Sequence, residues 1–579
     1  MRQVRWLSLL LVAACVDNGD LPTPGEGEPD TGTASRTVPR MFGIDVGAAP
    51  GEAYSTALSV AGSAGTTFVP MSLDWSMLEA GPDDTFSHAA LDTKKWDVSG
   101  AFAPDANAGV VRYAANHTTT AGNMRTRYTL GGDALSAEVA ANLLTGDGTE
   151  ATLLLRFGPY DTAGTRCSDP QDQYAALVLI KSSGATILVG LTCRNGVIRN
   201  EGAITTLPAA TTLRISRSPT TSSGGAAGGS LLIRSATSIV SAISLSLLPP
   251  AFAGPARVSL FAGTDAGGFA SVTLAAFHVA GTATWDNPDD RYVGDPAFDV
   301  PAAIRYIHAP LHTPLVITLR AIDTVATHLP SDLNATDPTT GLADMSRPEI
   351  RQRYKAAVDN LMARMPDVVI AGFSISNEVD GYLRGATAWA QATAFANDVI
   401  PYVSAKLAPG NPVGITVTSF GLRTSPTEIT ALENAATALF VTYYPLDSTF
   451  AAKDPSVVPG DINAMLATTT KPLLLIEAGY PSASFSPSCW TCTGSQAKQA
   501  AFFHQMFLAW DAHPDRILGF SVSWLTDLPT STLAGWGRYY GITSQNFLAY
   551  LGSIGVRSAS GVPKPALATI SSDAHARGF

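Results

Sequence analysis

Short apolar segments of strand length alternate with helical patterns over most of this 579-residue chain. The segments are apolar throughout, which indicates strands that are buried on both faces. Parallel strands need a long crossover connection, and the helical patterns between the segments supply it. Two such units precede residue 84 and the others follow residue 285. The expected strands are 42–46, 67–73, 315–319, 368–374, 414–418, 439–443, 472–476 and 517–522.

The helical patterns complete this alternation. Ser346 and Glu349 have the spacing of a capping box at the start of one helix. Eight buried strands, each followed by a helix, predict an α/β fold, a (β/α)8 TIM barrel over residues 41–84 and 286–579. Two doubly wound domains are the alternative, but no nucleotide-binding glycine motif follows a strand. The expected helices are 52–64, 300–308, 347–365, 386–407, 427–438, 461–467 and 496–513, with a last one beginning near 565.

The segment between the second and third strands, residues 85–285, has a different pattern. Strands rich in Val, Leu, Ile and Thr are separated by clusters of Gly, Asn, Asp and Ser, with almost no helix. This pattern predicts an antiparallel β-sandwich of the jelly-roll type, inserted into the barrel. Its two ends, 91–96 and 277–279, resemble those of concanavalin-like or laminin-G-like domains, which implies a role in carbohydrate binding. The expected strands are 109–114, 150–157, 175–181, 185–191, 211–216, 230–234, 257–262 and 270–279.

The N-terminus has the features of an export signal. Arg2 and Arg5 precede a mostly apolar stretch, and Cys15 follows two alanines. Residues 1–15 resemble a bacterial lipoprotein signal peptide, which implies lipidation at Cys15 and a membrane-anchored protein facing the periplasm or cell surface. An ordinary secretory signal, giving a secreted protein, is the alternative. Residues 16–40 are rich in Pro, Gly and acidic side chains, which is typical of a flexible linker.

The charge of the chain limits its partners. The formal net charge is −11, and the chain lacks the basic surface that neutralises nucleic-acid phosphates. No apolar run approaches the roughly 20 residues that span a bilayer. We therefore expect a monomer that binds no nucleic acid and contacts a membrane only through its lipid anchor.

Two glutamates follow strands of the predicted barrel. Glu378 comes just after the fourth strand and Glu477 just after the seventh. A carboxylate placed directly after a buried strand is costly unless a polar site receives it, and the C-terminal ends of barrel strands share one face. Retaining glycoside hydrolysis uses two carboxylates about 5 to 5.5 Å apart, one as nucleophile and one as acid/base. The pair fits this chemistry, although surface carboxylates at loop starts are the alternative.

The surrounding residues carry a family resemblance. Asn377-Glu378 and Glu477 resemble the clan A retaining glycoside hydrolases, and the nearest likeness is to the family 53 β-1,4-galactanases. The resemblance covers the barrel and does not extend to the sandwich. Further matches are G-x-D-V at 43–46, Y-Y-P at 443–445 and E-A-G-Y-P at 477–481.

The resemblance implies roles for individual residues. Glu378 is then the acid/base, Glu477 the nucleophile, and Asn377 the residue that binds the substrate 2-hydroxyl. Either Tyr443 or Tyr444, with Tyr443 favoured, holds Glu477 ionised. Trp524, after the last strand, is the aromatic platform under the sugar. This reaction requires no metal and no cofactor.

One departure from the clan is evident. Members usually carry an Arg at the end of the second strand, where this chain has Asp74 and Trp75. Arg320, at the end of the third strand, is the nearest replacement. With Asp323 it forms either a substrate-binding pair or a structural ion pair. Asp45 and Trp75 are further candidates for substrate contact, with packing as the alternative for Trp75.

Four cysteines remain once Cys15 is assigned to the anchor. Cys167 and Cys193 lie in the sandwich and are expected to form a disulfide. Cys489 and Cys492 form a C-x-x-C in a loop, which predicts a loop-tightening disulfide, with a redox-active pair as the alternative. No His stands at ligand spacing beside them, so no metal site is expected.

These features together predict an exported retaining β-glycoside hydrolase that acts on a polysaccharide or oligosaccharide. The alternative is a noncatalytic glycan-binding surface lipoprotein built on a degenerate barrel.

Overall fold

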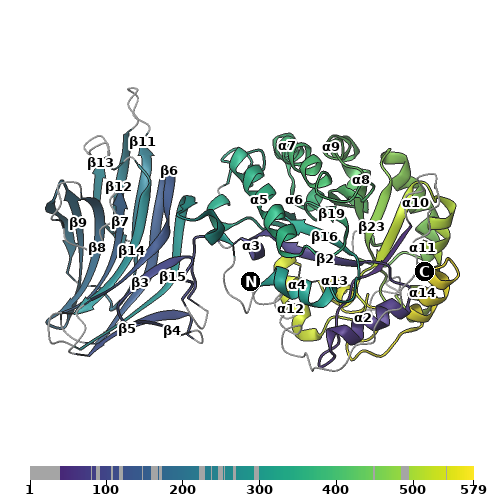
Figure 1. The fold of residues 1–579 in the computed structure, drawn as a ribbon, viewed down its shortest axis with the longest axis horizontal. Helices are drawn as coiled ribbons and strands as arrows, with labels where there is room; N and C mark the ends of the chain where they lie inside the picture. Colours follow the sequence, from purple (N-terminus) through teal and green to yellow (C-terminus); the bar gives the residue numbers. More distant parts are fainter. Residues whose placement is uncertain are drawn as a thin grey trace. The chain divides into compact units, whose positions relative to one another are not determined.

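A computed structural model was used to describe the fold (Figure 1). The described residues are 40–79, 81–86, 91–105, 108–116, 121–145, 148–157, 167, 172–205, 207–220, 228–235, 238–244, 252, 254–264, 269–292, 299–334, 336–447, 450–483, 494–542 and 544–579. The predictions for Cys15, Cys489 and Cys492, for the signal peptide and for most of the linker lie outside these residues.

The chain divides into two compact units. One, called here the α/β unit, comprises Met1–Leu78, Val300–Leu329 and Ala335–Phe579. The other, the inserted unit, comprises Glu79–Asp299 and Pro330–Asn334. It therefore extends beyond the segment 85–285 marked by the change in sequence pattern, and it includes a short stretch that follows the third strand of the α/β unit.

The strands of the α/β unit form two parallel sheets, in agreement with the predicted α/β class. One has the order β1-β24-β23-β22-β21 and the other the order β2-β16-β19-β20. The strands are β1 (Met41–Ile44), β2 (Val69–Asp74), β16 (Leu315–Arg320), β19 (Ile370–Ser374), β20 (Val413–Gly414), β21 (Thr416–Thr418), β22 (Leu439–Tyr443), β23 (Leu473–Ala478) and β24 (Ile517–Val522).

Backbone contacts link these two sheets at both edges. Gly43 in β1 forms a parallel bridge with Phe68, which directly precedes β2. At the other edge, the segment predicted as one strand is broken at Ile415 into β20 and β21. The Ile375 N–H donates to Gly414, and the Phe440 N–H donates to Ile415. The same segment thus bonds to a strand of each sheet.

Helices flank the parallel strands (Figure 1). In α5 the buried residues Ile350, Tyr354, Ala357, Val358 and Leu361 recur with the helical period, which explains why this segment packs as an amphipathic helix. No helix among the described residues is long and apolar enough to span a membrane. The main helices are α2 (Tyr54–Ser63), α4 (Val300–His308), α5 (Pro348–Arg364), α7 (Gly385–Ser404), α9 (Pro426–Leu432), α10 (Val458–Thr468), α11 (Gln496–Ala512), α12 (Thr530–Tyr540), α13 (Gln545–Leu551) and α14 (Pro565–His575).

The start of α5 differs from the sequence prediction. The N-cap is Arg347, without a side-chain cap, and Pro348 occupies the first helical position. The Ser346 hydroxyl donates to Asp344 instead, and Glu349 pairs with Arg347. The predicted capping box is therefore wrong, because a proline at the first position already fixes the helical φ and shifts the cap by one residue.

The inserted unit is an antiparallel sheet with one core of its own. Each predicted strand is present, and β3, β4, β6, β10 and β13 were not predicted. The strands are β3 (Trp96–Ser99), β4 (Phe102–Asp105), β5 (Val110–Asn116), β6 (Ala121–Thr145), β7 (Thr149–Phe157), β8 (Gln173–Ser182), β9 (Ala185–Arg194), β10 (Val197–Ile204), β11 (Ala210–Thr220), β12 (Gly228–Ser235), β13 (Ser238–Ser244), β14 (Ala256–Thr264) and β15 (Phe269–Trp285).

The longest strands, β6 and β15, run side by side and change partners midway. The first half of β6 pairs with β14 and the second half with β11. The change occurs near Gly131 and Gly132, where Gly132 has a φ of 108°. On β15, Gly281 has a φ of 117°, and a Cβ there would lie 3.0 Å from the Gly131 carbonyl oxygen. Glycine permits this conformation and this close approach.

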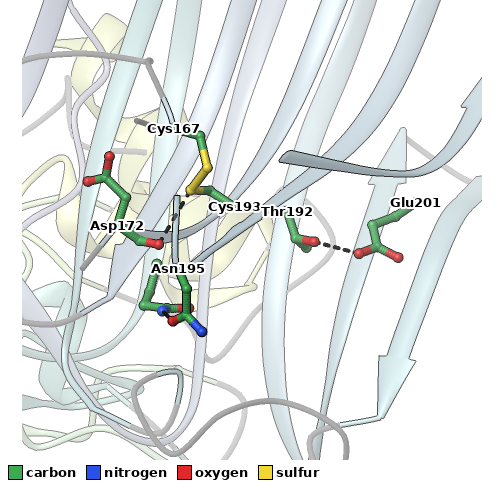
Figure 2. The surroundings of a disulfide bond; sticks show 7 residues. Cys167, Asp172, Thr192, Cys193, Asn195 and Glu201 are labelled. Atoms are coloured by element: carbon green, nitrogen blue, oxygen red, sulfur yellow. Dashed lines mark hydrogen bonds between the residues drawn. A yellow bond between two sulfur atoms is a disulfide. The ribbon is translucent and has the colours of Figure 1, made fainter. Parts of the chain in front are cut away.

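The inserted unit contains the predicted disulfide between Cys167 and Cys193 (Figure 2). The two Cα atoms are 5.7 Å apart, and Cys193 lies in β9. Next to it, the Thr192 hydroxyl donates to Glu201 on the neighbouring strand β10 (Figure 2). The disulfide closes a loop with a sequence separation of 26.

We expect that the double variant Cys167→Ala, Cys193→Ala is less stable in its inserted unit. Removing a cross-link over a loop of this size costs about 3 kcal/mol, because the unfolded chain gains conformational freedom. Differential scanning calorimetry would show a lower melting temperature for the variant. Peptide mapping under non-reducing conditions checks the pairing, and two separate thiol peptides in the wild type would contradict it.

Candidate active site

Glu378 follows β19 and marks the start of the short helix α6 (Val379–Tyr382). Its two carboxylate oxygens are both bound by hydroxyl groups. The Thr324 Oγ1 lies 2.6 Å from Oε2, and the Thr442 Oγ1 lies 2.7 Å from Oε1. These two threonines come from different strand ends, so they fix the carboxyl group from both sides.

Burial raises the pKa of Glu378 to about 8, and the nearby charge of Glu477 adds to this shift. The hydrogen bonds from Thr324 and Thr442 lower the pKa, but their effect is smaller. At neutral pH the side chain is therefore mostly protonated. A protonated carboxyl group held in a fixed orientation can donate a proton to a bound molecule.

Glu477 is the penultimate residue of β23 and is only partly exposed. The Tyr444 hydroxyl donates to its Oε2 at 2.8 Å and lies 3.0 Å from the Ser523 hydroxyl oxygen. A Cβ at Gly479 would come within 2.8 Å of the Tyr444 ring. Gly479 thus leaves the space that this tyrosine needs to reach Glu477.

Tyr443 was the favoured partner of Glu477, and this prediction is wrong. Its hydroxyl donates to Asp461 in α10 at 3.0 Å, and its ring lies against Phe502 in α11. Adjacent residues of a strand point to opposite faces. Tyr443 therefore faces the helices, whereas Thr442 and Tyr444 share the face that carries the glutamates.

Asp45 follows β1 and belongs to the same site. Its pKa is raised to about 7, mainly by burial and also by the charge of Glu477, while Arg320 lowers it. Within the described part of the chain, no hydrogen bond to its carboxylate is formed. A third acidic group thus lies within electrostatic reach of Glu477.

Arg320 and Asp323 lie in a buried ion network beside the glutamates. The Arg320 Nη2 lies 2.6 Å from Asp74 Oδ1, and its Nη1 lies 3.5 Å from Asp323 Oδ2. His328 also contacts both aspartates, at 3.3 and 3.6 Å. Arg320 and Asp323 are 6% and 0% exposed, so the alternative of a structural ion pair fits better than direct substrate contact.

Asn377 and Glu378 are both held by the segment after β16. The Asn377 Nδ2 donates to Asp323 Oδ1 at 3.0 Å, and a parallel bridge joins these residues. The next residue on each segment forms the Thr324–Glu378 hydrogen bond. Asp323 therefore supports Asn377, and the next residue on the same segment, Thr324, supports Glu378.

Left-handed backbone conformations concentrate at this site. Thr324, Glu378 and Trp524 have φ angles of 45°, 42° and 67°. Such angles are uncommon for side chains other than glycine, and for a β-branched residue especially so. Strained residues of this kind are typical of functional sites, where the surrounding structure holds them in place.

Trp75 and Trp524 were both predicted to contact substrate, and the structure decides the prediction for Trp75 only. Trp75 lies in α3 (Trp75–Leu78), is 0% exposed and packs edge-to-face against Tyr354 at 5.2 Å. Its predicted substrate contact is therefore wrong, because the side chain belongs to the core. Trp524 is half-buried, and its ring lies 5.9 Å from that of Trp536.

Several site residues were not predicted. Tyr550 in α13 has its pKa raised by burial and by the charges of Glu378 and Glu477, which places it near both. Thr442 was recognisable in principle, because it shares a strand face with Tyr444. Thr324 and His328 follow the two-residue strands β17 (Ile322–Asp323) and β18 (Ala326–Thr327), which are too short to be recognised from the sequence, and Tyr539 and Tyr550 lie in helices that were not predicted.

No family model and no curated protein matches the chain. Among similar solved structures is the GH53 catalytic domain of Ignisphaera aggregans, at 17% identity and a TM-score of 0.35, covering 49% of this chain and 81% of that one. A GH5_18 structure from Bifidobacterium longum subsp. infantis has 12% identity and a TM-score of 0.35, covering 51% and 66%. A legume lectin-like domain from Entamoeba histolytica has 12% identity and a TM-score of 0.26, covering 32% and 89%.

We expect Glu477→Gln to lower the pKa of Glu378. The substitution removes a nearby negative charge, so the ionised form of Glu378 becomes less unfavourable. The pKa should stay above its ordinary value, because burial is the larger cause and is unchanged. Carbon-13 NMR titration of labelled glutamate carboxyl groups measures this shift. Asp461→Asn, which alters the contact of Tyr443, is the control, and an unchanged pKa in Glu477→Gln would refute the coupling.

Proposed function

We propose that this protein is a retaining β-glycoside hydrolase that acts on a polysaccharide or oligosaccharide. The observation that carries the proposal is the pair of adjacent acidic side chains with different environments. Glu378 is buried and protonated, whereas Glu477 accepts a hydrogen bond from Tyr444. A general acid must carry a proton and a nucleophile must be ionised, so the two environments suit these two roles.

In the first step, a carboxylate oxygen of Glu477 attacks the anomeric carbon of the bound sugar. The glycosidic C–O bond breaks, and Glu378 transfers its proton to the departing oxygen. The products of this step are a glycosyl ester on Glu477, an ionised Glu378 and a free alcohol. The Tyr444 hydrogen bond favours the ionised form of Glu477 that the attack requires.

In the second step, Glu378 acts as a base. It removes a proton from a water molecule, whose oxygen attacks the anomeric carbon and breaks the ester to Glu477. The cycle returns both glutamates to their initial states. Two inversions at one carbon give net retention of configuration, and no metal or cofactor takes part.

The proposed scaffold is a single (β/α)8 barrel formed by the two parallel sheets. The Gly43–Phe68 bridge supports closure between β1 and β2, and the hydrogen bonds of Gly414 and Ile415 support it between β20 and β21. In such barrels the strand C-termini form the catalytic face. Glu378 follows the end of β19, and Glu477 is the penultimate residue of β23.

The inserted unit is proposed to be a β-sandwich that binds carbohydrate, and residues 1–15 an export signal with lipidation at Cys15. The enzyme is proposed to act as an anchored monomer outside the cytoplasm.

A β-1,4-galactan is the first substrate to test, because of the motifs shared with family 53. Arg320 then takes part only indirectly, through its charge near Asp45.

We expect Glu378→Ala and Glu477→Ala to abolish hydrolysis of β-glycans in different ways. Loss of general-acid catalysis costs about 10²- to 10⁴-fold in kcat. An aryl glycoside with a good leaving group needs little acid catalysis, so Glu378→Ala should still form its glycosyl-enzyme, whereas Glu477→Ala should not. Burst kinetics and mass spectrometry of the trapped ester measure this. Tyr443→Phe, on the opposite strand face, is the matched control and should retain activity.

Retention of anomeric configuration is a separate expectation. Proton NMR of fresh hydrolysate should show the β-anomer first, followed by slow mutarotation. The α-anomer as first product would indicate an inverting reaction and would exclude Glu477 as the nucleophile. If a panel of galactan, mannan, xylan and glucan is bound but never hydrolysed, the noncatalytic glycan-binding alternative holds.

A further inference from the structure

Thr324 contacts two carboxyl groups with one hydroxyl. Its Oγ1 lies 2.6 Å from Glu378 Oε2 and 3.5 Å from Asp323 Oδ1. A threonine hydroxyl has a single hydrogen and two lone pairs, so it can donate to only one of these groups at a time. It can still accept a hydrogen bond from the other group when that group carries a proton.

The backbone holds Thr324 in this position. It is the first residue of the two-residue turn between β17 and β18, and its φ of 45° is uncommon for a β-branched residue. Its N–H donates to the Asn377 carbonyl oxygen at 3.2 Å, one residue before Glu378. A Cβ at Gly381 in α6 would lie 2.5 Å from the Thr324 carbonyl oxygen, so glycine permits the close approach of these segments. The Thr324 hydroxyl oxygen is therefore held near both carboxyl groups.

Asp323 can accept the Thr324 hydrogen. The Tyr539 hydroxyl donates to its Oδ2 at 2.7 Å, and the Arg320 Nη1 lies 3.5 Å from the same oxygen. The Asn377 Nδ2 donates to Oδ1 at 3.0 Å. A carboxylate oxygen has two lone pairs, so Oδ1 can accept from Thr324 as well as from Asn377.

Thr442, the other hydroxyl partner of Glu378, differs from Thr324 in this respect. Its Oγ1 lies 2.7 Å from Glu378 Oε1, and among the described residues it makes no second side-chain hydrogen bond. Of the two hydroxyls, Thr324 is therefore the one whose hydrogen has an alternative acceptor within the described part of the chain.

The protonation state of Glu378 decides between the two acceptors of Thr324. An ionised Glu378 attracts the hydrogen, because its Oε2 is charged and lies nearer than Asp323. A protonated Glu378 is a weaker acceptor and can donate in return. We infer that Thr324 is a positioning residue whose hydroxyl hydrogen points to Asp323 while Glu378 is protonated and to Glu378 once that proton is lost.

This inference rests on the proposed function, in which Glu378 is first an acid and then a base. At the start, the Glu378 O–H donates to Thr324, and Thr324 donates to Asp323. After the Glu378 proton passes to the departing oxygen, the Thr324 hydrogen rotates about the Cβ–Oγ1 bond and donates to Oε2. When Glu378 takes a proton from water, the hydrogen rotates back. Thr324 loses no proton, and it keeps a hydrogen bond to Glu378 in both steps.

Several ionisable groups face Glu378, and none of them is altered by a substitution at Thr324. A change in the pKa of Glu378 in such a variant therefore reports on the hydroxyl. The groups are Glu477 from β23, Asp380 from α6, Asp323 after β16, Tyr444 after β22 and Tyr550 from α13.

Neutron diffraction from crystals of the full chain tests the inference directly, because it locates hydrogen atoms. Crystals at about pH 6 and about pH 10 lie on either side of the Glu378 pKa of about 8. We expect the Thr324 hydrogen to point to Asp323 at the lower pH and to Glu378 Oε2 at the higher pH. The same direction at both pH values would overturn the inference. It would leave the proposed hydrolase intact, because no substrate is involved.

A matched set of variants tests the same hydroxyl in solution. Thr324→Val keeps the branched shape without the hydroxyl, and Thr324→Ser keeps the hydroxyl. Carbon-13 NMR titration should show the pKa of Glu378 higher by about 1 in Thr324→Val, about tenfold in the acid dissociation constant, because the ionised form loses the stronger hydrogen bond. Thr324→Ser and Thr430→Val, an exposed threonine of α9, should keep the wild-type pKa. An unchanged pKa in Thr324→Val would contradict the role of Thr324.

The pH dependence of hydrolysis gives a second readout. The alkaline limb of kcat/KM reports loss of the Glu378 proton in the free enzyme, so it should move to higher pH in Thr324→Val. Thr324→Ser should restore the wild-type profile, which a merely structural role for the side chain would not predict. Hydrolysis of no substrate by the wild type in a broad β-glycan panel would instead overturn the proposed function.

Discussion

The electrostatic repulsion between the buried Glu378 and the nearby Glu477 is the interaction on which the rest of the site depends. Two ionised carboxylates cannot share such a site at low cost, so one of them keeps its proton. The threonine hydroxyls orient that proton, and Tyr444 favours the charge on the other side chain. The same repulsion reaches Asp45, whose charge is moderated by Arg320. The reactivity of each group is thus set by its neighbours.

This arrangement is possible because parallel strands end at a common edge. Asp45 and Glu378 follow buried strands, Glu477 is the penultimate residue of another, and the charged residues of β2 and β16 are their last ones, Asp74 and Arg320. The ion network of Arg320, Asp74 and Asp323 lies at the same edge and joins the guanidinium group to both carboxylates. It therefore supports Asn377 and Glu378 without competing for a ligand.

The sequence was sufficient for the parts of the fold that follow a regular period. The buried strands and their helices were predicted closely, and so were the two glutamates at the strand ends. The strand β6 was missed because Gly131 and Gly132 interrupt it. Tyr443 was favoured over Tyr444 although strand alternation places it on the other face. Helices α12 and α13 were not among the predicted helices, so the ring contacts that they make with Trp524 and Tyr444 were not predicted either.

The position of the inserted unit affects how the chain folds during synthesis. Strand β2 ends just before Glu79, but its partner β16 begins only after Asp299. At about 5 to 20 residues per second, a ribosome needs on the order of 10 to 40 s to make the segment between them. Throughout that interval β2 has no β16 beside it, and by its end all the strands β3 to β15 of the inserted unit have been made. The strands of the inserted unit can therefore pair with one another before β2 can pair with β16.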